Sequence, residues 1–147
     1  MVDVASYMDP RLVTHLDSTS REEAIKILVD KLDETGKLLD KSKFHQAILE
    51  REKLVSTGIG MGVALPHAKL SGYEEFFIAI GLASSGIEWP SLDHLPIRQI
   101  FLIGGPDHKQ TEYLQILSQL TSLIKNEQIR KKMLTLNSPQ DIIELFK

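Results

Sequence analysis

Apolar and polar residues follow one another along this chain in blocks that predict strands and helices. The first ten residues mix both kinds and are expected to form a tail or a short helical arm. The run Leu12–Leu16 has the β-branched content that is typical of a strand. Polar residues at 17–19 then predict a turn. The chain therefore opens with a strand that leads into helical sequence.

Two helices are predicted next. Ser20 and Glu23 have the spacing of a capping box, so we expect a helix that begins at residue 21. Gly36 stands where such a helix is capped at its carboxyl end. A second helix is expected over 41–53. Its expected buried face consists of Phe44, Ala47, Ile48 and Leu54.

Nearly continuous apolar runs in the middle of the chain predict interior strands. These runs are Phe76–Ala83 and Ile97–Ile103, and strands buried on both faces have this pattern. Ile87–Trp89 is expected to be a short strand that Pro90 ends. The polar stretch 69–75 before them is expected to be a loop or turn.

The last third of the chain is predicted to be helical. Apolar residues spaced at i, i+4, i+7 and i+11 predict a helix of three to four turns, and they are Tyr113, Leu117, Leu120 and Ile124. A shorter helix is expected over 127–136. Ser138 and Pro139 then form the start of a final helix. The order of elements predicts a single three-layer α/β domain spanning 1–147, with a mixed β-sheet flanked by helices on both faces.

Composition narrows the possible partners. The chain has 147 residues, a formal charge of −3 and no cysteine, so we expect one core, no disulfide and no thiolate metal site. No basic patch stands out, and we expect no nucleic acid partner. No apolar stretch is long enough to span a bilayer, and the first residues have no signal-peptide pattern. We therefore expect a cytoplasmic protein without membrane insertion.

The segment from Arg51 to His67 has the most informative chemistry. Gly58, Gly60 and Gly62 form a loop that no helix would tolerate. A short apolar run then leads to Pro66, which stiffens the chain directly before His67. A free imidazole titrates near neutral pH and can act as a nucleophile or a base. The pattern indicates a histidine that is presented to another molecule.

This segment resembles the phosphorylation-site signature of mannitol/fructose-type enzyme IIA domains. It reads Arg-Glu-x-x-x-Ser-Thr-Gly-Ile-Gly-x-Gly-x-Ala-x-Pro-His. These domains belong to the bacterial phosphoenolpyruvate:sugar phosphotransferase system, and the group includes the stand-alone nitrogen-regulatory enzyme IIA, which this chain resembles most. The resemblance extends from about Tyr7 to the end of the chain. It implies a phosphotransferase whose His67 accepts a phosphoryl group on its ε nitrogen from an HPr-type carrier, without a cofactor. It also implies transfer to an enzyme IIB in sugar uptake, or regulation of a target protein.

Several further residues are expected at the site. Charge spreads over the phosphoryl oxygens during transfer, so they need donors or positive charge. Backbone amides of Gly60 and Gly62 are candidates, since glycine-rich loops often bind phosphate. The resemblance adds Arg51, as a contact for phosphate oxygens or an acidic surface. It also adds Thr57, whose hydroxyl either donates to phosphate or caps a turn.

One residue departs from the family pattern. Many members have a second histidine in the first turn of the helix after the last strand, and here the matching residue is Tyr113. A phenol can donate a hydrogen bond but cannot become cationic. Tyr113 is equally well explained by packing on the apolar side of its helix. His108 is the other candidate for the place of the second histidine.

Three alternatives remain open from the sequence. His67 alone is compatible with a purely structural histidine at the end of a strand. The Tyr113 departure is compatible with a protein-binding module on the same fold that is never phosphorylated. A metal-dependent hydrolase would need ligands such as His67, His94 and His108, but their spacing matches no metal motif. We therefore expect no metal.

Overall fold

The computed structural model describes residues 2–17 and 20–147. Its elements, in chain order, are η1 (Val4–Tyr7), β1 (Met8–His15), α1 (Arg21–Glu34), α2 (Lys41–Leu54), β2 (Gly58–Gly60), β3 (Val63–Ala64), β4 (His67–Leu70), β5 (Phe77–Ile87), β6 (Ile97–Pro106), α3 (Gln110–Ile124), α4 (Glu127–Thr135) and α5 (Pro139–Glu144). None of the helices in these described ranges is long and apolar enough to cross a bilayer.

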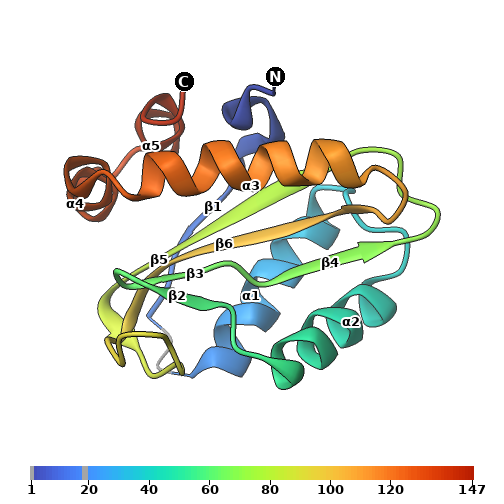
Figure 1. The fold of residues 1–147 in the computed structure, drawn as a ribbon, viewed down its shortest axis with the longest axis horizontal. Helices are drawn as coiled ribbons and strands as arrows, with labels where there is room; N and C mark the ends of the chain where they lie inside the picture. The colour runs from blue at the N-terminus through green and yellow to red at the C-terminus, as the bar shows by residue number, and fades with distance from the viewer. Residues whose placement is uncertain (1, 18–19) are drawn as a thin grey trace.

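The strands of the described residues form one mixed sheet of six strands. Their order is β1-β5-β6-β3-β2, and β4 also pairs with β6. β5 and β6 run antiparallel, whereas β1 is parallel to β5, and both β3 and β4 are parallel to β6. β6 is therefore a central strand, and β3 and β4 lie one after the other along the same side of it (Figure 1).

Helices cover both faces of the sheet, which confirms the predicted fold class. Figure 1 shows α3, α4 and α5 above the sheet and α1 and α2 below it. Each face has its own apolar core. The upper core includes Ile78, Ile80, Phe101, Ile116 and Phe146, and the lower core includes Ile25, Leu28, Phe44, Ile48 and Leu102. The near-continuous apolar pattern of β5 and β6 follows from this burial on both sides.

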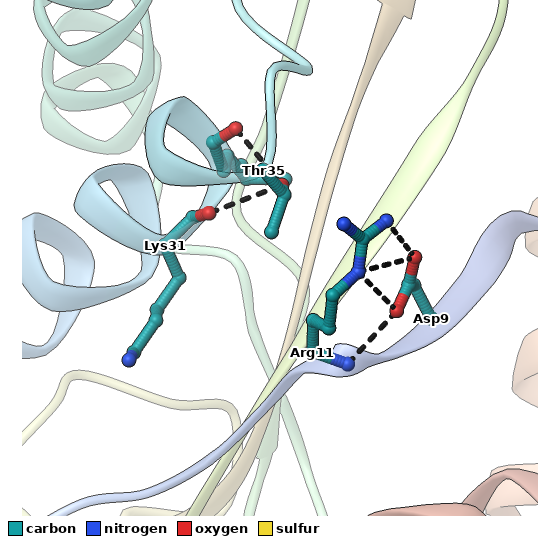
Figure 2. Close-up of polar contacts among 5 residues, drawn as sticks. Asp9, Arg11, Lys31 and Thr35 are labelled. Carbon is teal, nitrogen blue, oxygen red and sulfur yellow. Dashed lines mark hydrogen bonds and ion pairs between the residues drawn. The ribbon is translucent and has the colours of Figure 1, made fainter.

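The pairing of the edge strand β1 with β5 is irregular in the first half of the strand. Its register against β5 shifts between Met8 and Val13, and Pro10 lies in this interval. Figure 2 shows Asp9 and Arg11 facing each other there, with Arg11 Nη2 2.7 Å from Asp9 Oδ2. This ion pair lowers the pKa of Asp9. Charges, proline and irregular register at a sheet edge all discourage pairing with another chain.

Most predicted helix ends are confirmed. Ser20 Oγ accepts from the Glu23 amide at 3.1 Å, and α1 begins at the next residue. Gly36 follows α1 with a φ of +78°, as a carboxyl-terminal cap requires. The final helix begins at Pro139 behind Ser138. The predicted turn at 17–19 falls mostly on residues outside the described ranges.

Some boundaries were wrong for physical reasons. Leu54 was placed on the buried face of the second helix, but it is 79% exposed, and Glu52 is buried instead. The predicted loop at 69–75 begins with two residues that belong to β4. β5 continues through the polar stretch Ser84–Gly86 to Ile87, because a register shift against β6 absorbs the extra residues.

Candidate functional site

Pro66 lies between β3 and β4, which pair with β6 in one continuous register. Val63 pairs with Gln99 and His67 pairs with Ile103, so the offset along β6 is 36 in both pairs (99 − 63 and 103 − 67). Pro66 accepts a hydrogen bond from the Ile103 amide at 3.0 Å, which bridges the gap. Since proline has no N–H, Pro66 cannot donate a hydrogen bond to a neighbouring strand in return. The predicted stiff presentation of His67 thus has a structural basis in the continuous register.

β2 ends just before it reaches His67. Its pairing with β3 extends to the hydrogen bond from the Leu65 amide to Thr57 O at 3.1 Å. Beyond that point the chain of β2 leads back to α2, so β4 pairs with β6 and not with β2. β4, which begins at His67, therefore lies at a sheet edge that opens where β2 departs, between α2 on one face and α3 on the other (Figure 1).

The imidazole of His67 is fixed through one nitrogen. Nδ1 lies 3.0 Å from the carbonyl oxygen of Leu65, and since a carbonyl can only accept, the proton is on Nδ1. Nε2 is then the unprotonated nitrogen, and within residues 2–17 and 20–147 no group donates a hydrogen bond to it. The ring is half-buried. This tautomer leaves a nucleophilic lone pair on Nε2.

The surroundings of His67 disfavour its charged form. Burial lowers the pKa of the imidazole, although the hydrogen bond to Leu65 acts in the opposite direction. The positive charges of Arg51 and Lys69 lower the pKa further. His67 is therefore neutral at neutral pH, which is the state that a nitrogen nucleophile needs.

Tyr113, and not His108, lies against His67. The two ring centroids are 5.8 Å apart with an interplanar angle of 48°. On another side Tyr113 stacks on Phe76 at 6.0 Å. Burial raises the pKa of the phenol, so it stays protonated and can donate a hydrogen bond. His108 is exposed in the loop before α3, with Nδ1 3.7 Å from the carboxylate of Asp107.

Two cationic side chains share a shallow hollow with His67. The hollow is lined by Ala47, Arg51, His67, Ala68 and Lys69. Arg51 comes from the last turns of α2, where its Nη1 donates to Val55 O at 2.8 Å. Lys69 comes from β4, two residues after His67, and residues with this spacing in a strand project from the same face. The hollow is therefore positively charged and open to the surface.

Thr57 is placed next to this region, but its hydroxyl proton is already engaged. Its Oγ1 donates to Glu52 Oε1 at 2.6 Å, and its amide donates to Glu52 Oε2 at 2.8 Å. Trp89 Nε1 donates to the same carboxylate at 3.3 Å. All three residues are buried. Thr57 therefore holds a buried carboxylate at the end of α2, and this contact leaves it no hydroxyl proton for a phosphate oxygen.

The structure does not bring Gly60 and Gly62 to His67. Gly60 ends β2 and Gly62 lies in the turn to β3, with φ values of +94° and +75°. The carbonyl of Gly62 accepts from the amides of Arg98 and Gln99, whereas His67 lies beside Ile103. Four positions along β6 correspond to about 13 Å at roughly 3.3 Å per residue. The expectation that these glycine amides surround the phosphoryl group is therefore not supported by the geometry.

The same turn is organised by Asp93. Its carboxylate accepts from the amides of Met61 at 2.9 Å and Leu95 at 3.1 Å, and these backbone bonds lower its pKa. Met61 itself has a φ of +60°, an uncommon value for a residue other than glycine. In the described part of the chain, no three imidazole or carboxylate side chains come together as metal ligands would.

Sequence reasoning missed three groups at this site. The Leu65 carbonyl sets the tautomer of His67, but a backbone acceptor leaves no mark in the sequence. Lys69 was visible two residues after His67, and the period-two rule could have placed it on the same face once β4 was known to be a strand. Glu52 stood in the signature as a charged residue, and nothing in its spacing revealed that it is buried.

Comparisons with known proteins agree with this fold and with the signature. Residues 6–147 match the family model described as "Phosphoenolpyruvate-dependent sugar phosphotransferase system, EIIA 2". The chain is 37% identical over 132 residues to the fructose-specific EIIABC component of Bacillus subtilis, covering 90% of this chain and 21% of that protein. The chain thus spans about a fifth of that relative.

A relative of another kind has nearly the same length. The nitrogen regulatory protein of Bradyrhizobium diazoefficiens is 30% identical over 131 residues, covering 89% of this chain and 85% of that protein. Among solved structures, the nitrogen regulatory protein IIA-Ntr of Neisseria meningitidis has a TM-score of 0.90 at 23% identity, covering 98% of this chain and 99% of that one. The chain therefore belongs to the EIIA 2 family of the phosphoenolpyruvate-dependent sugar phosphotransferase system.

Proposed function

We propose that this protein is a phosphocarrier in which Nε2 of His67 accepts a phosphoryl group from an HPr-type phosphohistidine protein. The observation that carries the proposal is the hydrogen bond between Nδ1 and the Leu65 carbonyl. It holds the proton on one nitrogen and leaves the other free at the rim of a positively charged hollow. Membership of the EIIA 2 family agrees with this role.

The bonds that are made and broken in the transfer involve only the two imidazoles and the phosphoryl group. The N–P bond of the donor breaks, and its electron pair stays on the donor nitrogen. The lone pair of His67 Nε2 forms the new N–P bond. The proton on Nδ1 remains in its hydrogen bond to Leu65 O, so the carbonyl oxygen stabilises the positive charge of the phosphorylated ring. Arg51 is proposed to attract the acidic donor group or its phosphoryl oxygens from the rim of the hollow.

Two uses of the phosphorylated protein follow from the relatives. One relative has the name of a fructose-specific component and another that of a nitrogen regulatory protein. We propose that His67 either passes its phosphoryl group to the cysteine of an enzyme IIB or controls the binding of a target protein. A phosphoryl group adds charge and acceptor oxygens at an exposed edge of the sheet, and this is enough to change a contact surface.

Phosphorylation in a reconstituted chain of carriers tests the proposal. The protein is incubated with phosphoenolpyruvate, enzyme I and an HPr-type carrier, and its intact mass is measured before and after acid treatment. We expect an acid-labile gain of one phosphoryl group that is lost in His67→Ala and retained in His45→Ala, a histidine of α2. No gain in the wild-type protein would instead favour the protein-binding module, for which the Tyr113 departure is the supporting observation.

The downstream role is tested separately. Phosphorylated and unmodified protein are each presented to an enzyme IIB, and the loss of phosphate from His67 is followed by mass. Rapid loss to the cysteine of the enzyme IIB supports a relay. A stable phosphoprotein whose capture of target proteins differs from that of the unmodified form supports a regulator.

A further inference from the structure

We propose that Lys69 provides the positive charge that Tyr113 cannot, and that its ammonium group contacts the phosphoryl oxygens during transfer to His67. This inference rests on the proposed function. It concerns a residue to which neither the signature nor the family comparison gives a role. It explains how a site with a phenol in the place of a second histidine can stabilise a charged group.

The first observation is that Lys69 is held in position on both sides. Its Nζ lies 4.1 Å from the centroid of the Tyr113 ring, within the range of a cation–π contact. The same Nζ donates to Gln110 Oε1 at 2.6 Å. Gln110 and Tyr113 both lie in the first turn of α3. A lysine held by two contacts loses less freedom on binding phosphate than a free one would.

The second observation is the position of this ammonium group relative to His67. Lys69 and His67 project from the same face of β4 and line the same hollow. The Tyr113 ring that carries the ammonium group is itself in ring contact with His67. Tyr113 thus contacts both the cation and the nucleophile, and its burial keeps the phenol uncharged.

The third observation concerns hydrogen-bond capacity. An ammonium group has three donors, and one of them is used by Gln110. The remaining donors are available to phosphoryl oxygens, over which charge is spread as the N–P bond of the donor breaks and the bond to Nε2 forms. Lys69 takes no part in bond making: it keeps its proton and acts through charge and hydrogen bonding.

Transfer rates measured over a range of donor concentrations test this role. Single-turnover phosphorylation by a phosphorylated HPr-type carrier is compared for the wild-type protein, Lys69→Gln, Lys69→Arg and the matched control Lys132→Gln, an exposed lysine of α4. We expect Lys69→Gln to lower the maximal rate by about 10- to 100-fold, less than the loss of a fully buried oxyanion donor. Its half-saturating donor concentration should change little. Lys69→Arg should restore most of the rate, and Lys132→Gln should behave as the wild type.

Other results overturn the inference without touching the proposed function. If Lys69→Gln accepts phosphate at the wild-type rate, or if only its half-saturating concentration rises, Lys69 does not act on the phosphoryl group. If Lys69→Arg is as slow as Lys69→Gln, the side chain acts by packing on Tyr113 and not by charge. Gln110→Ala provides an independent variant: it frees Lys69 while keeping the charge, and should lower the maximal rate by less than Lys69→Gln. An equal or larger loss contradicts the proposal. Failure of the wild-type protein to be phosphorylated at His67 would instead defeat the proposed function.

Discussion

The glycines of the Arg51–His67 signature and the histidine at its end have different roles, although they belong to one continuous segment. At the His67 end, an imidazole and two cations line an open hollow, and the Tyr113 phenol contacts the imidazole and one of the cations. At the glycine end, the turn between β2 and β3 uses its backbone groups internally, through Asp93 and through the start of β6. The first end has unused donors and a free lone pair. The second is a support for the sheet.

The comparison teaches that a long motif need not be a single site. Strand β3 and β4 extend the chain along β6, so residues five positions apart in the motif, Gly62 and His67, are about 13 to 17 Å apart at roughly 3.3 Å per residue. The region between them is stabilised by Glu52, which joins the end of α2 to Thr57 and Trp89. Substitutions at the two ends should therefore affect different quantities.

The largest expected effect on stability is at the link between the two ends. Glu52→Ala removes the acceptor of the Thr57 amide, the Thr57 hydroxyl and the Trp89 indole, all of them buried. Buried donors without a partner are costly, so we expect the free energy of unfolding to fall by about 2–4 kcal/mol. Urea unfolding monitored by Trp89 fluorescence measures this change.

Glu50→Ala is the matched control for this prediction. Glu50 is an exposed residue of the same helix that accepts from Gln46. Its removal should change the free energy of unfolding by less than about 0.5 kcal/mol. If both variants lose the same free energy of unfolding, the buried carboxylate of Glu52 stabilises the fold no more than an exposed one.

The second prediction separates the glycine end from the chemistry. Gly60 has a φ of +94°, and an added Cβ would lie 3.3 Å from Asp93 Oδ2. We expect Gly60→Ala to lower the free energy of unfolding by about 1–2 kcal/mol. The rate at which the folded variant accepts a phosphoryl group should remain within threefold of the wild-type rate. This corresponds to a change of about 0.7 kcal/mol or less in the activation free energy.

Gly36→Ala gives the cost of the backbone conformation alone. Gly36 has a similar φ of +78°, with nothing within 4 Å of the added Cβ. If Gly60→Ala instead slows phosphoryl transfer at least tenfold while the protein stays folded, the glycine amides belong to the phosphate site and the division between the two ends is wrong.

The smallest expected effect is on the titration of His67. Burial and then the charges of Arg51 and Lys69 lower its pKa below the ordinary value of about 6.5. Nε2 should therefore stay unprotonated at neutral pH, and phosphoryl acceptance should decline only when the pH falls below that value. Lys69→Gln removes one of the charges that disfavour the imidazolium, so it should raise the pKa of His67. Titration of the imidazole by NMR measures the pKa of His67 in the wild-type protein and in Lys69→Gln.

The lowered pKa of His67 also makes the free energy of unfolding depend on pH. The folded-state pKa of His67 lies below the unfolded-state value, so the unfolded chain binds more protons in the window between them. The contribution of His67 to the free energy of unfolding is therefore retained above about pH 6.5 and declines as the pH falls toward the folded-state pKa. A pKa of His67 above the ordinary value would contradict this environment.

The sequence predicted the fold class because periodic patterns record burial directly. The apolar runs of β5 and β6, the cap at Ser20 and the proline at 139 were each local signals that the tertiary structure kept. Leu54 and Glu52 were misplaced because a helical pattern near its end does not show which residue meets a neighbouring strand. Glu52 is buried because Thr57 and Trp89 offer it donors, which is a tertiary fact.

The site was predicted in part for similar reasons. His67 was found through Pro66 and the signature. Tyr113 was a candidate because it matches the second histidine of the family, and the structure places its ring against His67. The geometry does not support the predicted role of the glycines, because a loop rich in glycine indicates backbone freedom without showing what the freedom serves. At Gly60 and Gly62 it serves a tight turn with positive φ values.

The position of the phosphoryl group on the ring tests the account most directly. The phosphorylated protein, labelled with ¹⁵N in its histidines, is studied by NMR to identify which ring nitrogen is bonded to phosphorus. The structure predicts phosphorus on Nε2 of His67, with a proton still on Nδ1 in its hydrogen bond to Leu65 O. Phosphorus on Nδ1, or on any other residue of the chain, would contradict the central claim.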